Sequence, residues 1–225
     1  MINHLAVIMD GNRRWAKNHS LQPWLGHKEG IKPINEVINF CLDNQINYLT
    51  LYTFSIENLK RPEIEKHYLF TILIDYAQNY FISLAEKNIR VRFIGQRSLF
   101  PIELIETIEN IETKTAASNG LLINILFCYG GQQELIDVFK NYSKIDSKNT
   151  ELTYQDIRKL SWLGDCPEPE LIIRTGGHKR LSNFMLAHSA YSELYFLDDF
   201  WPDITRAHFD NILVEFKNVQ RNFGT

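Results

Sequence analysis

The chain opens with the segment 4–9, HLAVIM, which runs directly into the segment 10–15, DGNRRW. The first segment is apolar and breaks at Asp10, as a short buried strand does. The second is polar and places Gly11 ahead of a stretch suited to a helix, so the pair predicts a strand, a turn and a helix. This order recurs along the chain, and the alternation favours an α/β fold with a mostly parallel sheet.

Short apolar segments rich in β-branched and aromatic residues mark the expected strands, at about 4–9, 48–54, 89–94, 121–127, 170–174 and 194–197. Longer segments with helical spacing lie between them, at about 28–44, 62–87, 98–117, 131–143, 153–162 and 205–221. The polar stretch 144–152 contains no Gly or Pro, which indicates a surface loop rather than a domain boundary. We therefore expect one α/β domain, residues 1–225, with a central, mostly parallel six-stranded sheet flanked by helices.

The composition bounds the class of protein. The 225 residues are 44% hydrophobic and 23% charged, which is ordinary for a globular chain, and the net charge of −3 argues against a nucleic-acid partner. Cys41, Cys128 and Cys166 are widely spaced, which disfavours a disulfide framework or a cysteine zinc site. The N-terminal apolar run is too short for a signal peptide, and no run approaches the ~18 residues of a membrane span, so we expect a cytoplasmic protein.

Four of the expected strands are followed at once by a polar or glycine-rich cluster. These clusters are 10–15 (DGNRRW), 55–62 (SIENLKRP), 129–131 (YGG) and 174–183 (RTGGHKRLSN). In open α/β sheets, ligands bind beyond the carboxyl ends of the strands, where these clusters would meet. One such cluster is an ordinary turn, whereas four at one sheet edge indicate a binding site.

The first cluster combines the features of a phosphate site with a carboxylate. Gly11 allows close approach of a ligand to the backbone, the following helix offers free N–H groups, and Arg13 and Arg14 add charged donors. Asp10 would repel a phosphate unless Mg²⁺ bridges the two, and Mg²⁺ commonly binds one or two carboxylates together with substrate phosphates. Taken alone, the cluster is better explained as an Asp-Gly turn with two solvated arginines.

A second candidate anion site surrounds a Gly-Gly turn and contains Arg174, Lys179, Arg180 and Ser182. A basic surface loop explains this cluster equally well when it is considered alone. Two anion sites at one sheet edge would serve two phosphorylated substrates or one long one.

Three further residues keep both a functional and a structural interpretation. Glu193 is a metal-ligand candidate beside an expected strand. His27 follows Gly26, and His178 lies within the basic segment 174–183. A lone histidine is more often structural, although His178 lies inside the basic segment. The aspartates of 198–203 (DDFWPD) stand beside a Trp-Pro pair after a strand, so we do not expect a metal site there.

These clusters, in this order, resemble the cis-prenyltransferase (undecaprenyl diphosphate synthase) family. The matching stretches are MDGNRRWA (9–16), GHKEG (26–30), TLYTFSIEN (50–58), RP (61–62), YGG (129–131), IRTGG (173–177), RLSNF (180–184), SELYF (192–196) and WPD (201–203). The resemblance covers about 4–224 and implies a hydrophobic tunnel beside the sheet and a homodimer. It also implies successive cis addition of isopentenyl diphosphate to an allylic diphosphate such as farnesyl diphosphate, with Mg²⁺.

The resemblance assigns roles by matching position. Asp10 would hold Mg²⁺, supported by Glu193 across the dimer interface. The residues for the allylic diphosphate would be Gly11, Asn12, Arg14 and His27, with Arg13 and Trp15 as further substrate contacts. Isopentenyl diphosphate would bind at Arg174, Arg180 and Ser182. Ser55, Asn58 and Arg61, together with Asp10, match positions implicated in catalysis.

From the resemblance we expect an undecaprenyl diphosphate-like carrier lipid for cell-wall glycan synthesis, with peripheral membrane contact when the product leaves. One alternative is a divergent family member that makes a short or irregular prenyl diphosphate. Another is a non-catalytic partner subunit, which the retained Asp10, Arg14 and Arg174 disfavour.

The departures from the family pattern motivate the short-product alternative. They are Pro23, Leu59, Gln132, the pair His178 and Lys179, and Asn222, and three of them remove a positive charge near the expected diphosphates. Leu126 and Phe127 stand where small residues are common, so bulk facing the tunnel would shorten the product. The helix 62–87, with Tyr68, Leu69, Ile72, Leu73, Tyr76, Tyr80 and Phe81, is the expected tunnel wall.

Overall fold

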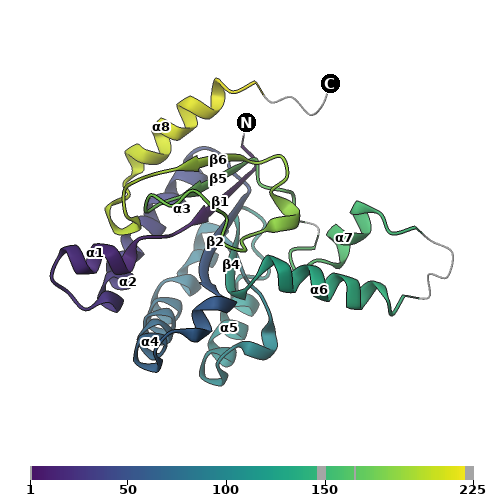
Figure 1. The fold of residues 1–225 in the computed structure, drawn as a ribbon, viewed down its shortest axis with the longest axis horizontal. Helices are drawn as coiled ribbons and strands as arrows, with labels where there is room; N and C mark the ends of the chain where they lie inside the picture. Colours follow the sequence, from purple (N-terminus) through teal and green to yellow (C-terminus); the bar gives the residue numbers. More distant parts are fainter. Residues whose placement is uncertain (1, 146–150, 165, 221–225) are drawn as a thin grey trace.

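A six-stranded sheet forms the centre of the computed structural model, which describes residues 2–145, 151–164 and 166–220 (Figure 1). The strands are β1 (His4–Ile8), β2 (Tyr48–Ser55), β3 (Arg90–Ile94), β4 (Leu122–Tyr129), β5 (Leu171–Arg174) and β6 (Glu193–Phe196). Their order is β3-β4-β2-β1-β5-β6, and every neighbouring pair is parallel. The expected sheet is confirmed, and the carboxyl ends of its strands meet at one edge.

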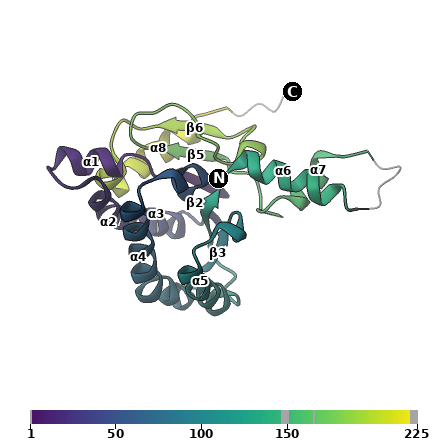
Figure 2. The same cartoon turned by 60° about the horizontal axis from the view of Figure 1, so that its bottom comes forward.

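The helices are α1 (Asn12–Asn18), α2 (Gly26–Glu29), α3 (Ile31–Asp43), α4 (Glu63–Asn79), α5 (Ile102–Thr115), α6 (Gly131–Tyr142), α7 (Tyr154–Leu160) and α8 (Arg206–Lys217). Apolar side chains of α3, α4, α5 and α8 pack with one face of the sheet in a single large core. The other face carries a smaller core that includes the segments around Leu163 and Phe184. In both views α1 and α2 lie at one end of the molecule and α6 and α7 at the other (Figures 1 and 2).

The helix expected over 62–87 is divided in the structure. The α-helix ends at Asn79, and a 3₁₀ helix continues from Phe81 to Lys87. The carbonyl of Tyr80 accepts hydrogen bonds from both the amide and the hydroxyl of Ser83, at 3.0 and 2.7 Å, which tightens the backbone into a three-residue repeat. The sequence contains no Gly or Pro at this point, so its periodicity alone could not reveal the break.

Adjacent residues of β4 serve opposite faces of the sheet. Phe127 packs in the large core with the rings of Phe54, Phe70 and Phe100, at centroid distances of 5.3, 6.0 and 5.2 Å. Leu126 packs in the smaller core on the other face. The pairing of β2 with β4 shifts register between Leu126 and Phe127 and again after Phe127, where Cys128 adopts a left-handed φ of 48°. Cys128 is buried and free, as are the other two cysteines.

A buried row of polar side chains crosses the sheet near the start of its strands. His4 Nδ1 donates to the carbonyl of Pro167 (2.6 Å), and His4 Nε2 accepts from the hydroxyl of Thr50 (2.8 Å). Asn124 Nδ2 donates to Thr50 Oγ1 (3.1 Å), and Arg92 Nη2 donates to Asn124 Oδ1 (2.8 Å). Burial lowers the pKa of His4 to about 4, because the charged imidazolium would lose its hydration.

Within the described ranges, no helix combines the length and the apolar character that a membrane span requires.

Candidate active site

The polar clusters after β1, β2 and β5 meet because the three strands are parallel neighbours. Ile8 of β1 pairs with Tyr52 of β2 on one side and with Arg174 of β5 on the other. Asp10 therefore lies beside the end of β5, and the turn that starts at Ser55 follows β2 at the same edge. This register confirms that these three clusters meet at one edge of the sheet.

Asp10 and Arg174 form the charged centre of the site. Arg174 Nη2 donates to Asp10 Oδ2 at 2.8 Å, and Arg14 Nη2 approaches Asp10 Oδ1 at 3.3 Å. Arg174 Nη1 donates to Ser182 Oγ at 2.8 Å and to the carbonyl of Arg180. Burial raises the pKa of Asp10, but the hydrogen bond and charge of Arg174 outweigh it and lower that pKa below its usual value.

Packing requires glycine at position 11. Its φ is 110°, a left-handed value, and a Cβ at this position would lie 2.7 Å from Cδ1 of Phe200. Gly11 also lines the cationic cavity described below, and the close approach of a ligand to its backbone stays a prediction. Asn12, at the start of α1, is buried and donates from Nδ2 to the carbonyl of Met9 at 3.1 Å.

A cavity of about 420 Å³ opens over Asp10 and is lined by five cationic side chains. These are Arg13, Arg14, Lys17, Arg61 and Arg180. Such a concentration of positive charge matches a ligand with several negative charges, and a diphosphate is the ligand class that suits it. Lys17 is a site residue that the sequence reading missed, because a lysine at the end of a short helix is usually solvated.

Glu65 is the second residue that the sequence did not reveal. Its carboxylate is 1% exposed, and Oε1 lies 3.3 Å from Arg61 Nη1 and 3.6 Å from Arg13 Nε. It therefore orients two of the five cations from beneath the cavity. In the sequence it stands between Glu63 and Lys66 on α4 and reads as one more surface charge.

His27 lies in the wall between polar and apolar space. Its Nε2 is buried and has no hydrogen-bond partner among the described residues. Burial, followed by the charges of Arg61 and Arg13, lowers the pKa of His27 to about 3, so the imidazole is neutral near pH 7. A neutral ring with an unpaired nitrogen at this place can hydrogen-bond a bound anion without adding charge.

The turn after β2 has a defined hydrogen-bonding pattern. The amide of Ser55 donates to Asn58 Oδ1 at 3.2 Å, and the Ser55 side chain accepts from the backbone three residues on. Leu59, a departure from the family pattern, packs against the large core instead. The turn thus holds Ser55, Asn58 and Arg61 at the mouth of a second cavity.

This second cavity, of about 310 Å³, extends from the polar centre into the large core. Its apolar lining comes mainly from α3, α4 and the sheet, and includes Ile34, Leu69, Ile72, Leu73, Tyr76, Phe54 and Phe127. The expected wall is confirmed at Leu69, Ile72, Leu73 and Tyr76, whereas Tyr68 and Tyr80 do not line the cavity. The side chain of Phe81 lies outside the part of the chain that the structure describes. Phe127 faces it and Leu126 does not, because they occupy opposite faces of β4.

The two cavities adjoin one another. Met9, Asp10, Asn12, His27 and Arg61 line both. Arg174 and Ser182 line the apolar cavity at its mouth, and Arg180 lines the cationic one. The arrangement can hold a charged head group at one end of an oily chain.

Two expected site residues lie elsewhere. Trp15 lines neither cavity: it stacks on His19, at a centroid distance of 3.9 Å, and its Nε1 donates to Asp203 Oδ1 at 2.6 Å. Glu193 begins β6, opposite Leu171, whereas Asp10 lies beyond the other end of β5. Within one chain the structure therefore does not bring Glu193 to Asp10.

The residues that depart from the family pattern lie in different environments. Pro23 begins a short 3₁₀ helix, and Lys17 supplies a cation to the cavity in its vicinity. His178 lines the cationic cavity, whereas Lys179 is exposed and lines neither cavity. Gln132 is exposed, and Asn222 lies outside the described residues.

Residues 8–224 match the family model of the undecaprenyl diphosphate synthases, Prenyltransf. The chain belongs to this family. It is similar to the isoprenyl transferase of Neisseria meningitidis serogroup A, with 39% identity over 98% of this chain and 88% of the relative. The isoprenyl transferase of Thermotoga maritima is 38% identical over 98% of this chain and 96% of its own length.

Solved structures of this family agree with the fold. Lavandulyl diphosphate synthase from Lavandula x intermedia, in complex with dimethylallyl diphosphate, superposes with a TM-score of 0.95 at 26% identity, covering 100% of this chain and 98% of that one. A probable undecaprenyl diphosphate synthase from Campylobacter jejuni superposes with a TM-score of 0.84 at 31% identity, covering 100% and 99%. The protein is therefore a cis-prenyltransferase, an enzyme of isoprenoid biosynthesis.

Proposed function

We propose that the protein elongates an allylic diphosphate, farnesyl diphosphate in the first instance, by repeated cis addition of isopentenyl diphosphate. The product is an undecaprenyl diphosphate-like carrier lipid for cell-wall glycan synthesis. The observation that carries this proposal is that the cationic cavity adjoins the apolar one, with Asp10, Asn12, His27 and Arg61 lining both. A substrate with a diphosphate head and a prenyl tail fits both.

The allylic diphosphate binds in the cationic cavity. Arg13, Arg14 and Lys17 face its charge, and His27 donates a hydrogen bond while remaining neutral. Its prenyl tail enters the apolar cavity, where burial stabilises it by about 0.8 kcal/mol per CH₂ group. The tail is thereby retained between successive additions.

Isopentenyl diphosphate binds at Arg174, Arg180 and Ser182, near the mouth of the apolar cavity. Its double bond attacks the first carbon of the allylic chain, the carbon–oxygen bond to the departing diphosphate breaks, and a proton leaves the isopentenyl unit. The cations stabilise the negative charge that develops on the departing diphosphate. Ser55, Asn58 and Arg61 border the space where the two substrates meet.

Asp10 is a fitting ligand for Mg²⁺. Its carboxylate lines both cavities and remains ionised because its pKa is lowered. No group of three or more acidic, histidine or cysteine side chains that could cage a metal occurs in the described part of the chain, which suits an ion that takes most of its ligands from substrate phosphates and water. When bound, Mg²⁺ supplies charge neutralisation to the departing diphosphate.

A homodimer would bring a second Glu193 within reach of this site. Exposed apolar side chains are available for such an interface on α6, on α7 and around β6, namely Ile136, Phe139, Tyr154, Tyr191 and Leu194. We further propose that the dimer is cytoplasmic and contacts the membrane only peripherally, where its product is released.

The test is incubation of the pure protein with labelled isopentenyl diphosphate, Mg²⁺ and each of dimethylallyl, geranyl and farnesyl diphosphate, followed by sizing of the products. A ladder of long polyprenyl diphosphates from farnesyl diphosphate is the expected result. Absence of incorporation with every primer would refute the proposed substrates, and omission of Mg²⁺ should abolish incorporation.

The size of the apolar cavity favours a second candidate, a shorter product. A void of about 150 Å³ accepts benzene, with six carbon atoms, so by proportion about 310 Å³ accepts roughly twelve. This is close to two or three isoprene units, and Phe127 is one of the side chains that limit the space. Incorporation that ends after one or two additions would support this candidate over the carrier lipid.

A further inference from the structure

Asn183 joins three loops at the carboxyl edge of the sheet. Its carbonyl accepts a hydrogen bond from the amide of Gly131 (2.7 Å), and its Oδ1 accepts one from the amide of Gln132 (2.8 Å). Its Nδ2 donates to Gln133 Oε1 (3.1 Å) and to Glu57 Oε1 (2.8 Å). One side chain thus ties its own loop to the turn after β4 and to the turn after β2.

The loop that Asn183 holds has a strained backbone. Ser182, Asn183 and Met185 have φ values of 51°, 65° and 42°. Left-handed backbone is strained for most residues, although asparagine tolerates it better. Such a conformation persists only where the surroundings enforce it, and the contacts of Asn183 provide that constraint.

The Gly130-Gly131 pair is explained by this docking. A Cβ on Gly130 would lie 2.7 Å from Asn183 Nδ2, and a Cβ on Gly131 would lie 3.2 Å from the carbonyl of Asn183. Neither glycine lines the cationic or the apolar cavity. The glycine cluster after β4 therefore receives a loop, whereas its position in the sequence suggested a ligand.

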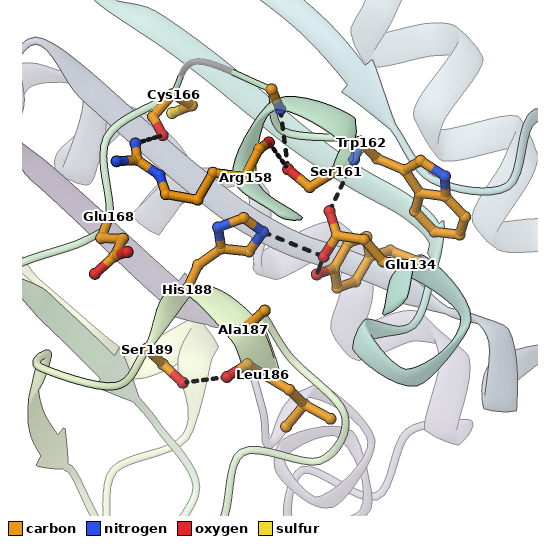
Figure 3. Close-up of polar contacts among 12 residues, drawn as sticks. Glu134, Arg158, Ser161, Trp162, Cys166, Glu168, Leu186, Ala187, His188 and Ser189 are labelled. Carbon is orange, nitrogen blue, oxygen red and sulfur yellow. Dashed lines mark hydrogen bonds and ion pairs between the residues drawn. The ribbon is translucent and has the colours of Figure 1, made fainter. Parts of the chain in front are cut away.

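The far end of the same loop is anchored separately on α6 (Figure 3). The carboxylate of Glu134, 1% exposed, accepts hydrogen bonds from the hydroxyl of Tyr129 (2.6 Å) and the amide of Trp162 (3.0 Å). His188 Nε2 lies 3.4 Å from Glu134 Oε2. With this end held at His188, the position of Ser182 depends on the contacts of Asn183 together with the hydrogen bond that Ser182 accepts from Arg174.

Glu57 extends the connection to the turn after β2. It lies in the turn Ile56–Lys60, between Ser55 and Asn58. The amide of Ser55 donates to Asn58 Oδ1. The hydrogen bond from Asn183 to Glu57 therefore ties the Ser182 loop to the turn that holds these two side chains at the mouth of the apolar cavity.

We propose that Asn183 is a positioning residue that fixes Arg180 and Ser182 relative to Ser55 and Asn58. The proposal rests on the function proposed above, because it takes the Arg180–Ser182 loop as the isopentenyl diphosphate site. Asn183 acts through its neighbours and does not contact the substrate.

Asn183→Asp tests the donor side of this arrangement. The aspartate keeps an acceptor for the amide of Gln132 but sets an oxygen against the carboxylate of Glu57. We expect the KM for isopentenyl diphosphate to rise about tenfold, while the KM for farnesyl diphosphate stays within about twofold. Asn183→Gly accepts the left-handed backbone without cost but has no side chain. It should likewise raise the KM for isopentenyl diphosphate much more than the KM for farnesyl diphosphate.

The double variant Glu57→Gln, Asn183→Asp provides a rescue. It restores one donor and one acceptor between the two positions, with the direction of the hydrogen bond reversed. We expect its KM for isopentenyl diphosphate to return to within about threefold of the wild type. Asn88→Asp is the matched control, because Asn88 is also a left-handed asparagine (φ 56°) whose Nδ2 donates to a neighbour, but it precedes β3 at the opposite edge.

An unchanged KM for isopentenyl diphosphate in Asn183→Asp would overturn the proposal. Equal increases in both KM values, a lowered unfolding temperature and no recovery in the double variant would overturn it too, because they indicate general destabilisation. Calorimetric titration with isopentenyl diphosphate alone, where no turnover occurs, should show the same weakening. A wild-type protein that incorporates no isopentenyl diphosphate would instead refute the proposed function.

Discussion

Replacement of Phe127 by alanine should lengthen the product. The ring lines the apolar cavity and packs against Phe54, Phe70 and Phe100. The phenyl group is the size of benzene, which a void of about 150 Å³ accepts, so the cavity of about 310 Å³ would grow by up to half. Since an isoprene unit has five carbon atoms and the ring six, the longest product should gain about one unit.

The substitution also has a cost in stability, which the assay must separate from the change in product. A buried Phe→Ala change typically lowers the free energy of unfolding by about 3–5 kcal/mol. Leu126→Ala is the matched control, because Leu126 directly precedes Phe127, is equally buried, and packs in the core on the opposite face of the sheet. It should lower the unfolding temperature and leave the product unchanged.

The assay is a time course with farnesyl diphosphate and labelled isopentenyl diphosphate at a temperature where both variants are folded. Products are resolved by chain length and the longest is scored. Identical longest products from the wild type and Phe127→Ala would refute the reasoning, as would the same lengthening in Leu126→Ala.

Three more predictions concern charge. Lys17→Ala should raise the KM for the allylic diphosphate about fivefold, since an exposed charge contact contributes up to ~1 kcal/mol, and should make that KM less salt-dependent; no change would remove Lys17 from the site. Glu65→Gln should lower kcat/KM about tenfold by releasing Arg61, whereas the exposed Glu63→Gln should not; equal effects would contradict a positioning role. The folded-state pKa of His4 is lowered to about 4 from 6.5, so the unfolded chain binds more protons in that window, and about 3 kcal/mol of stability present above pH 6.5 is lost as the pH falls to 4. Urea titrations across this range should show that the free energy of unfolding of His4→Gln falls less steeply with pH than that of the wild type. An equal fall in both proteins would contradict this role of His4.

The sequence predicts the sheet well, because each strand is a short apolar run and four of the runs end at a polar or glycine-rich cluster. Parallel order then places Asp10 beside Arg174 without any knowledge of distances. It predicts the helical segments less well, since the break after Asn79 involves a hydrogen bond from the Ser83 hydroxyl to the carbonyl of Tyr80, three residues earlier, which no periodicity in the sequence reveals.

The misplaced and missed site residues have a common physical cause. Trp15 and Lys17 lie on the same short helix, and only the rotation of that helix decides that the lysine faces the cavity and the tryptophan faces Asp203. Glu65 carries the same charge as the exposed Glu63 two positions earlier, and burial alone distinguishes them. The spacing of residues along the chain does not reveal helix rotation or burial. It also does not reveal how a second copy of the chain would have to pack for its Glu193 to reach this site.

The pairing of Asp10 with Arg174 has a consequence for the order of events in catalysis. Without ligands, each of these two side chains serves as the counter-ion of the other, at 2.8 Å. A cation that takes the carboxylate frees the guanidinium for an anion, and an anion that takes the guanidinium frees the carboxylate for a cation. Either ligand arriving alone leaves one half of the former pair without compensation, so the two should bind with positive cooperativity. The protein would then load metal and diphosphate as a neutralised unit.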